Sequence, residues 1–386
     1  LDDFKDINDL YGHLAGDQVI KVIAERLGGC TRSPDLAVRL GGDEFAVLIR
    51  NSRSQSSERH AEILLDALTR PIVWDGITLG VKASIGIVTA DASADPGSNP
   101  IDWLRKADIA MYASKNRTKN GYLVFHADLE SSLSERKRME SELSIMIGAE
   151  SSEIWMQPIL KQSDGSLFAL EALSRWFHPV LGEISPLTFI RMAEDTKLID
   201  RFDRSVIRRC CALISELRLR HPELYLCINV SALTLMEPDF SAFIARQIRL
   251  HSIPDGALML EITETVLASD EAALLNGIRA IRQLGVRFLI DDFGTGYSSL
   301  SRLNALPLDF LKIDGSFLVA LDNGQDTICK TIIRMAHSLG MQVIAEGVET
   351  EAQRRRLAEL ACDYLQGYYF AKPMDPKQLE HYLRSH

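Results

Sequence analysis

Two adjacent aspartates end a short apolar run in the stretch Ile290-Asp291-Asp292-Phe293-Gly294-Thr295-Gly296-Tyr297. Residues 286–290 are mostly apolar and β-prone, which predicts a buried strand. Neighbouring side chains on a strand point to opposite faces, so both carboxylates can serve one site only where the strand ends. Such close carboxylates repel each other unless a cation neutralises them, which points to a divalent metal. Taken alone, the pair also fits an acidic turn that merely ends a strand.

The composition narrows the class of protein. A chain of 386 residues, 46% of them hydrophobic, predicts two or three domains with cores of their own. The net charge of -10 argues against a protein that coats nucleic acid but is compatible with a nucleotide ligand. No apolar run reaches the roughly 18 residues that span a bilayer, and no signal peptide is recognisable. The six cysteines lack C-x-x-C spacing, so we expect reduced thiols and a cytoplasmic protein, or the cytoplasmic part of a membrane-anchored one.

Eight strand-like runs alternate with mostly helical patterns from residue 153 onward. The runs cover residues 154–159, 167–173, 225–230, 258–262, 287–291, 310–313, 342–345 and 364–367, and helical patterns cover 201–220, 270–284, 328–339 and 350–361. Eight strands with mostly helical connections favour a (β/α)8 barrel over an open sheet. The first two runs are also close enough together to form a hairpin.

Polar side chains stand at the downstream ends of seven of these runs. In a barrel those ends meet at one mouth, where barrel enzymes place their chemistry. A ring of five carboxylates, an amide and a lysine would be electrostatically costly there without cations. Oxygen ligands without His or Cys suit Mg²⁺ or Mn²⁺ rather than zinc. The residues at these ends are Glu171, Asn229, Glu261 with the nearby Glu264, Asp291 with Asp292, Lys312, Glu346 and Gln366.

This segment resembles the EAL family of cyclic di-GMP phosphodiesterases over residues 142–386. The resemblance implies a TIM-barrel-like α/β fold and hydrolysis of one phosphodiester of cyclic di-GMP to give linear pGpG. Met156 departs from the family, in which a tyrosine is common before Gln157-Pro158, and we expect it to affect ligand packing rather than catalysis. The motifs that carry the resemblance are Glu171-Ala172-Leu173-Ser174-Arg175-Trp176, Asn229-Val230-Ser231, Glu261-Ile262-Thr263-Glu264, Asp291-Asp292-Phe293-Gly294-Thr295-Gly296, Lys312-Ile313-Asp314, Ala345-Glu346-Gly347-Val348-Glu349 and Gln366-Gly367-Tyr368.

The resemblance also implies roles for individual residues. Lys312 would orient or deprotonate the attacking water, or neutralise the phosphorane, unless it is simply paired to a carboxylate. Glu264 would brace the glycine loop after Asp292, which is expected to move and to be coupled to dimerisation. Two Mg²⁺ or Mn²⁺ ions are expected, one held by Glu171, Asn229, Glu261 and Asp291, the other by Asp291, Asp292 and Glu346. The expected catalytic residues are Lys312, Glu346 and Glu264, and the expected substrate-binding residues are Gln157, Arg175 and Gln366.

The first 125 residues have a different pattern. A helix is predicted over 18–27, and strands over 36–40 and 45–49 flank the acidic two-glycine turn Gly41-Gly42-Asp43-Glu44, which is typical of a hairpin. The glycines would let the backbone approach a ligand closely, and the acids could hold metal beside phosphates. A helix around 55–69, strands near 77–89 and a helix over 101–115 complete an α+β domain.

These residues resemble the GGDEF family of diguanylate cyclases, which join two GTP molecules into cyclic di-GMP on a nucleotide-cyclase-like palm. The family's first metal-binding aspartate would precede Leu1, and Thr118-Lys119-Asn120 replaces the usual Gly-Arg-Asn. We therefore expect a truncated domain that does not make cyclic di-GMP in this chain, whereas a longer parent could. The resemblance implies guanine contacts by Asn8 and Asp17, a GTP and metal turn at Gly41, Gly42, Asp43 and Glu44, phosphate contacts by Lys115 and Lys119, and a product-inhibition site at Arg32 and Asp35.

The predicted organisation is a GGDEF domain over 1–126, a helical linker over 127–141 and an EAL domain over 142–386. Three interpretations stay open: a phosphodiesterase whose first domain senses GTP or product, a bifunctional parent that also synthesises cyclic di-GMP, and a non-catalytic cyclic di-GMP receptor. The complete ring of metal ligands favours an enzyme. The expected partners are cyclic di-GMP, GTP and a second copy of the chain, without nucleic acid polymers or membrane contact.

Overall fold

The chain forms two compact units joined by one helix. The computed structural model describes residues 1–50, 57–89, 99–117, 119–264, 271–294, 303, 305–323 and 325–385. The units are Leu1–Met139 and Glu140–His386, and their boundary falls inside the continuous helix α5 (Ala127–Gly148). Only the second half of α5 buries apolar side chains, Leu143, Met146 and Ile147. No helix among the described residues is both long and apolar enough to cross a membrane.

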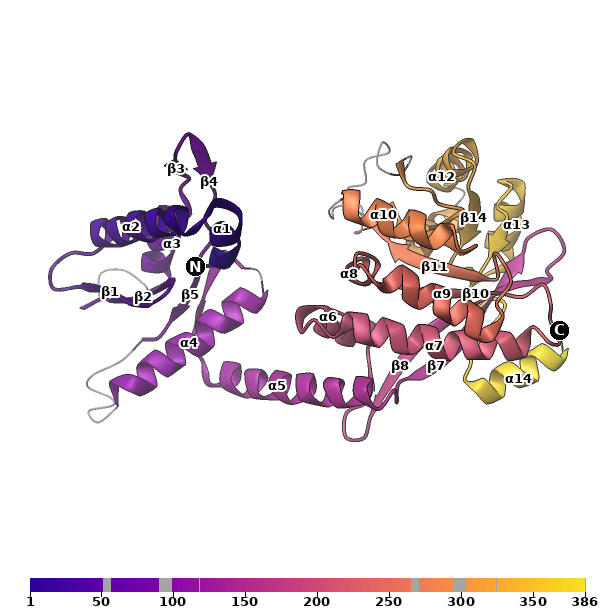
Figure 1. Ribbon diagram of the computed structural model, residues 1–386, viewed down its shortest axis with the longest axis horizontal. Coiled ribbons are helices and arrows are strands. Elements are labelled where there is room, and N and C mark those ends of the chain that lie inside the picture. Colours follow the sequence, from indigo (N-terminus) through magenta and orange to yellow (C-terminus); the bar gives the residue numbers. More distant parts are fainter. Residues whose placement is uncertain are drawn as a thin grey trace. The chain divides into compact units, whose positions relative to one another are not determined.

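The first unit is an α+β domain, as its pattern predicts (Figure 1). Strands β1 and β2 form an antiparallel hairpin, β3 pairs antiparallel with β4, and β5 pairs in parallel with β6. Helices α2 and α3 pack on a core that includes Val19, Ile23 and Leu68. The elements are α1 (Phe4–Tyr11), α2 (His13–Cys30), β1 (Leu36–Gly41), β2 (Glu44–Leu48), α3 (Ser57–Thr69), β3 (Ile72–Trp74), β4 (Ile77–Leu79), β5 (Ser84–Ile87), α4 (Pro100–Arg117) and β6 (Gly121–Val124).

The second unit is a closed barrel of eight strands with helices around it, which confirms the predicted fold. Its strands are β7 (Glu153–Lys161), β8 (Leu167–His178), β10 (Tyr225–Asn229), β11 (Leu258–Thr263), β12 (Arg287–Phe293), β13 (Phe310–Ile313), β14 (Gln342–Ala345) and β15 (Tyr364–Leu365). Strands β8 and β10 to β15 pair in parallel, and β7 closes the ring antiparallel to both β15 and β8. The hairpin considered for the first two runs is therefore present within the barrel.

The remaining described elements of this unit surround the barrel or extend it (Figure 1). The short strand β9 (Gly182–Ile184) pairs antiparallel with the end of β8 outside the ring. The helices are α6 (Pro186–Asp195), α7 (Ile199–Leu217), α8 (Ala232–Leu235), α9 (Phe240–His251), α10 (Glu271–Arg282), α12 (Thr327–Ser338), α13 (Glu351–Glu359) and α14 (Pro376–Ser385), with 3₁₀ turns η3 (Gly315–Phe317) and η4 (Val319–Asn323).

The two ends of the barrel interior differ in polarity. An apolar cluster that includes Phe168, Met259, Phe310 and Tyr364 fills the end where the parallel strands begin. The rings of Phe168 and Tyr364 stack with centroids 4.0 Å apart. The opposite end, where the parallel strands finish, holds the charged side chains. The apolar cluster fills the barrel below the charged groups, which therefore lie on the mouth side.

Candidate active site

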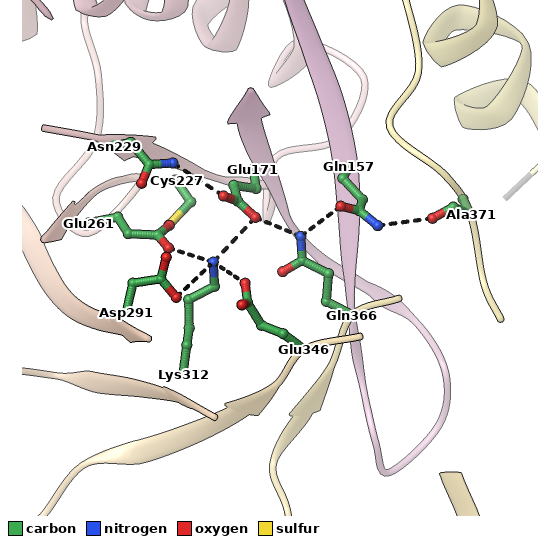
Figure 2. Close-up of polar contacts among 10 residues, drawn as sticks. All are labelled: Gln157, Glu171, Cys227, Asn229, Glu261, Asp291, Lys312, Glu346, Gln366 and Ala371. Carbon is green, nitrogen blue, oxygen red and sulfur yellow. Dashed lines mark hydrogen bonds and ion pairs between the residues drawn. The ribbon is translucent and has the colours of Figure 1, made fainter. Parts of the chain in front are cut away.

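The charged residues predicted at the strand ends gather at one point of the barrel mouth (Figure 2). Glu171 lies on β8, Glu261 on β11, Asp291 on β12 and Lys312 on β13, and Glu346 directly follows β14. Parallel pairing aligns these positions, since Asn229 of β10 is in register with Glu261 of β11. The strand alternation then turns these side chains to the same interior.

A bulge in β12 brings both aspartates to the site. Between Ile290 and Phe293 this strand has one residue more than β13, where the matching partners are Leu311 and Ile313. Asp292 takes up the extra length with a left-handed φ of 55°, a conformation that costs a non-glycine residue about 1–2 kcal/mol. The bulge breaks the strand alternation, so carboxylate oxygens of Asp291, Asp292 and Glu346 lie within 4.8 Å of one another.

Lys312 is the centre of the carboxylate ring. Its side chain is only 1% exposed, and its Nζ lies 2.5 Å from Glu261 Oε1 and in close contact with Glu346 Oε1. Glu171 Oε2 follows at 3.3 Å and Asp291 Oδ1 at 3.7 Å. A buried ammonium is strongly unfavourable unless it is paired. One lysine cannot balance the four carboxylates around it, so the site keeps an excess of negative charge.

The excess negative charge shifts the protonation of these groups. Burial raises the pKa of Glu346 to about 8, and burial together with the charge of Glu171 raises the pKa of Glu261 well above its usual value. Burial, and then the neighbouring Asp291, also raises the pKa of Asp292. For Lys312, burial lowers the pKa, but the surrounding carboxylates outweigh it and the pKa is raised. Each of these shifts reflects anions held close together away from water.

The carboxylates fit divalent cations. Asp291 Oδ1 is buried and has no hydrogen-bond partner among the described residues, which is costly for an anionic oxygen unless a cation is bound. Two groups of three acids are close enough to bind a cation, namely Glu171, Glu261 and Glu346, and Asp291, Asp292 and Glu346. The acid common to both groups is Glu346, whereas the sequence predicts Asp291 as the bridging ligand. Asn229 donates to Glu171 Oε1 through Nδ2 at 3.2 Å.

Two glutamines extend this network away from the ring (Figure 2). Gln366 donates through Nε2 to Glu171 Oε2 at 2.6 Å and to Gln157 Oε1 at 3.2 Å. Gln157 in turn donates to the carbonyl of Ala371 at 3.1 Å. Gly367, directly after Gln366, packs against the backbone of Val348, where a Cβ would lie 2.1 Å from the carbonyl oxygen. The buried Oε1 of Gln366 has no partner among the described residues and is available to a ligand.

Glu264 lies beside the end of β12. Its Oε2 accepts a hydrogen bond from the backbone N–H of Gly294 at 2.9 Å. This contact holds the backbone directly after the bulge. The rest of the glycine loop that is predicted to move, from Thr295 to Tyr297, lies outside the described residues.

Sequence reasoning missed two neighbours of the site. Cys227, on β10, donates through Sγ to Glu261 Oε2 at 3.3 Å, and burial raises the pKa of its thiol well above the usual value. Trp155, on β7, lies under Arg175, with 5.5 Å between the guanidinium carbon and the ring centroid. Both residues stand two positions before a predicted site residue, Asn229 and Gln157 respectively. The twofold alternation of a strand was the signal that could have found them.

The residues predicted to bind GTP in the first unit are more exposed. Asn8 packs closely on Gly16, where a Cβ would come 2.1 Å from Asn8 Oδ1, next to Asp17 in the sequence. The β1–β2 turn carries Gly41, Gly42, Asp43 and Glu44, and Arg39 donates to the Gly42 carbonyl at 2.7 Å. The Leu1 amino group lies 3.4 Å from Asp43 Oδ2, and Lys119 Nζ lies 2.9 Å from Asp3 Oδ1. Lys115 is on α4, and Thr118 lies outside the described residues.

The predicted product-inhibition residues form a tight turn ahead of β1. Asp35 accepts hydrogen bonds from the backbone N–H groups of Arg50 at 2.9 Å and Arg32 at 3.3 Å. Asp35 therefore closes the turn, while the Arg32 side chain is exposed to solvent.

Comparisons with known proteins identify both units. A family model described as EAL domain matches residues 140–373, and one described as diguanylate cyclase, GGDEF domain, matches residues 1–121. The cyclic di-GMP phosphodiesterase NbdA of Pseudomonas aeruginosa is 36% identical over 389 residues, covering 100% of this chain and 49% of NbdA. The bifunctional diguanylate cyclase/cyclic di-GMP phosphodiesterase MucR of the same organism is 34% identical over 385 residues, covering 98% of this chain and 55% of MucR.

The chain thus spans about half the length of these two relatives. A solved structure described as a PaMucR phosphodiesterase in complex with c-di-GMP matches with a TM-score of 0.59 and 34% identity. That match covers 63% of this chain and 99% of the other chain.

Proposed function

The chain belongs to the EAL family, with a GGDEF domain ahead of its EAL domain, and we propose that its barrel hydrolyses cyclic di-GMP to linear pGpG. The observation that carries the proposal is the buried ring around Lys312, in which Glu171, Glu261 and Glu346 are brought together. Such a concentration of charge is costly to the fold and is typical of a catalytic site. A phosphodiesterase also agrees with the similarity to NbdA and MucR.

The cation-binding residues in this proposal are Glu171, Asn229, Glu261, Asp291, Asp292 and Glu346. Two Mg²⁺ or Mn²⁺ ions, when bound, would activate a water and neutralise the charge that develops on the phosphate. The chain itself orients the ligands: Gln366 holds one oxygen of Glu171, and Cys227 holds one oxygen of Glu261. Glu264 fixes the backbone that follows Asp292.

The remaining residues of the mouth act on the substrate. Arg175 binds a phosphate, because its guanidinium can donate two parallel hydrogen bonds to phosphate oxygens. Lys312 supplies positive charge next to the attacked phosphate and orients the water. Gln157 and Gln366 contact the dinucleotide, Gln366 through its unpaired Oε1. The apolar cluster below the ring limits attack to the side open to solvent.

The first unit, in this proposal, binds GTP and regulates hydrolysis. Glu44 is exposed, Asp43 is partly exposed, and Lys119 pairs with the exposed Asp3, so this region is suited to a ligand that brings its own metal and phosphates. We place the chain in the cytoplasm and expect it to act as a homodimer.

The direct test is chromatography of cyclic di-GMP after incubation with the protein and Mg²⁺ or Mn²⁺. Linear pGpG is the expected product, and its absence at every cation concentration would refute the proposal. A non-catalytic receptor would bind cyclic di-GMP and leave it intact. A bifunctional protein would, in addition, form cyclic di-GMP from GTP, which the same chromatography detects.

A further inference from the structure

Arg175 has two neighbours that lie outside the motifs that carry the family resemblance, Trp155 and Glu183. Its side chain is only 14% exposed, and its guanidinium lies over the ring of Trp155. The Nε atom lies 3.4 Å from Oε1 of Glu183, whose side chain is 50% exposed. This distance is longer than a normal hydrogen bond, so the pair is held by charge rather than by a tight contact. Arg175 Nη1 donates to the Ser174 carbonyl at 3.1 Å.

Both neighbours are held in place by the fold. Trp155 donates through Nε1 to Glu153 at 3.0 Å, and its ring lies 6.0 Å from that of Phe177. Glu183 is on β9, in register with Phe177 of β8. The intervening turn is closed by His178, whose Nδ1 accepts from the N–H groups of Val180 and Leu181 at 3.1 and 3.0 Å. The Glu183 carboxylate is thus presented to Arg175 by a hairpin whose turn is closed by two hydrogen bonds to His178.

A carboxylate in this position competes with a phosphate. It neutralises the guanidinium while no ligand is present, and it must release Arg175 before the phosphate can take up both donor edges. A half-exposed ion pair without a tight hydrogen bond is weak, so the release costs little. The indole under the guanidinium keeps its plane fixed during the exchange, because the stacked cation is attracted to the ring face.

We propose that Glu183 and Trp155 are positioning residues that set the affinity for the dinucleotide through Arg175. Glu183 holds the guanidinium in the free protein and yields it to a phosphate of the ligand. Trp155 keeps the guanidinium in the orientation that the phosphate requires. This inference rests on the proposed function, because the phosphate is taken to be that of cyclic di-GMP.

The test compares Glu183→Gln, Trp155→Ala and Trp155→Phe with the parent chain. An Arg32→Ala background removes the product-inhibition site of the first unit from the measurement. Calorimetry in EDTA gives Kd for cyclic di-GMP, and hydrolysis with Mg²⁺ gives KM and kcat. Glu380→Gln is the matched control, since Glu380 is 59% exposed and also pairs with an arginine, Arg384.

Glu183→Gln is expected to lower Kd and KM about two- to fivefold, with a smaller gain at high salt, because an exposed pair of this kind is weak and screened. Trp155→Ala should raise both constants by a similar factor, and Trp155→Phe should recover much of the loss. Glu380→Gln should match the parent.

An unchanged or raised Kd and KM for Glu183→Gln would overturn the inference, as would a Trp155→Phe variant no better than Trp155→Ala. If the parent binds cyclic di-GMP without hydrolysing it, the proposed reaction fails while the Kd comparison still decides the inference. If neither Kd nor KM can be measured for any variant, both fail.

Discussion

The barrel mouth and the candidate GTP-binding region of the first unit use the same residue types in opposite surroundings. Lys312 is 1% exposed and is surrounded by four carboxylates, whereas Lys119 of the first unit is 47% exposed and pairs with Asp3. Charges interact far more strongly away from water, so the barrel ring constrains protonation and cation binding before any ligand arrives. Asp3 and Glu44 of the first unit are exposed to solvent, and a ligand must bring the charges that give such acids a function. Burial, rather than residue type, separates a preorganised site from a receptive one.

The largest effect should come from removing one carboxylate of the ring. Asp291→Asn keeps the shape of the side chain and removes its charge, so we expect kcat for cyclic di-GMP hydrolysis to fall about a hundred- to thousandfold. Circular dichroism should show an unchanged fold, because Asp291 supplies charge rather than core packing. Glu380→Gln removes an exposed carboxylate of α14 and serves as the control. Retention of more than a tenth of the parental kcat would contradict the preorganised role of the ring.

Removing the cations should lower the thermal stability of the barrel and leave that of the first unit unchanged. Binding of Mn²⁺ to the folded barrel at a hundred times its Kd contributes about 2.7 kcal/mol to the free energy of unfolding. Thermal unfolding in EDTA should therefore begin in the barrel at a lower temperature than in Mn²⁺. Asp291→Asn should lose most of this difference, while Asp43→Asn should keep it. If Asp291→Asn and Asp43→Asn show the same shift in unfolding temperature between EDTA and Mn²⁺, the cation does not bind preferentially at the buried ring.

Asp203, a buried acid of the barrel unit outside the carboxylate ring, tests the effect of burial on its own. Burial raises the pKa of Asp203 to about 7, although hydrogen bonds from Thr234 and the Ser231 N–H oppose this. A carboxyl whose folded pKa lies above its unfolded value binds more protons in the folded state, so stability falls as pH rises from about 4 to 7.

Asp203→Asn cannot ionise and should escape that loss. We expect the variant to gain about 2 kcal/mol over the parent between pH 4 and pH 8, roughly half of the full linkage value. Urea unfolding at both pH values measures the gain, and Asp239→Asn, at a 75% exposed carboxylate, should show none. Parallel stability curves for Asp203→Asn and the parent would contradict a raised pKa.

The smallest expected effect is regulation by the first unit. GTP should change the rate of cyclic di-GMP hydrolysis a few-fold, which corresponds to a coupling of about 1 kcal/mol. Asp43→Ala should remove the response to GTP. The measurement is the hydrolysis rate of the parent chain and of Asp43→Ala, each with and without GTP. A parent chain whose rate does not change with GTP would show that the first unit is not a GTP sensor in this chain.

Strand periodicity predicted most of the barrel, because buried parallel strands are short apolar runs that end in polar residues. The predicted run 310–313 coincides with β13, and 342–345 with β14. Gathering these ends at one mouth needed only the topology of the fold. The antiparallel direction of β7 stayed open because a short connection is compatible with a hairpin and local sequence does not give strand direction.

Features that depend on distances between strands could not be predicted. The sequence shows Asp291 and Asp292 but not the bulge that lets both face one site. It shows Lys312 at a strand end but not that its Nζ lies at the centre of the ring. The pairing of Arg175 with Glu183 depends on the β8–β9 turn. In each case the feature depends on where a side chain lies in space, and the packing of several strands determines that position.

The bulge in β12 also has a consequence for how such a barrel could change during evolution. A single-residue deletion at Asp292 would restore the regular ladder between Ile290 and Phe293 and relieve the left-handed backbone. We expect this shortened barrel to be more stable and less active, since one of the two acid groups would lose a member. The extra residue therefore lowers stability and raises activity. Where selection for activity is relaxed, we expect the residue to be lost.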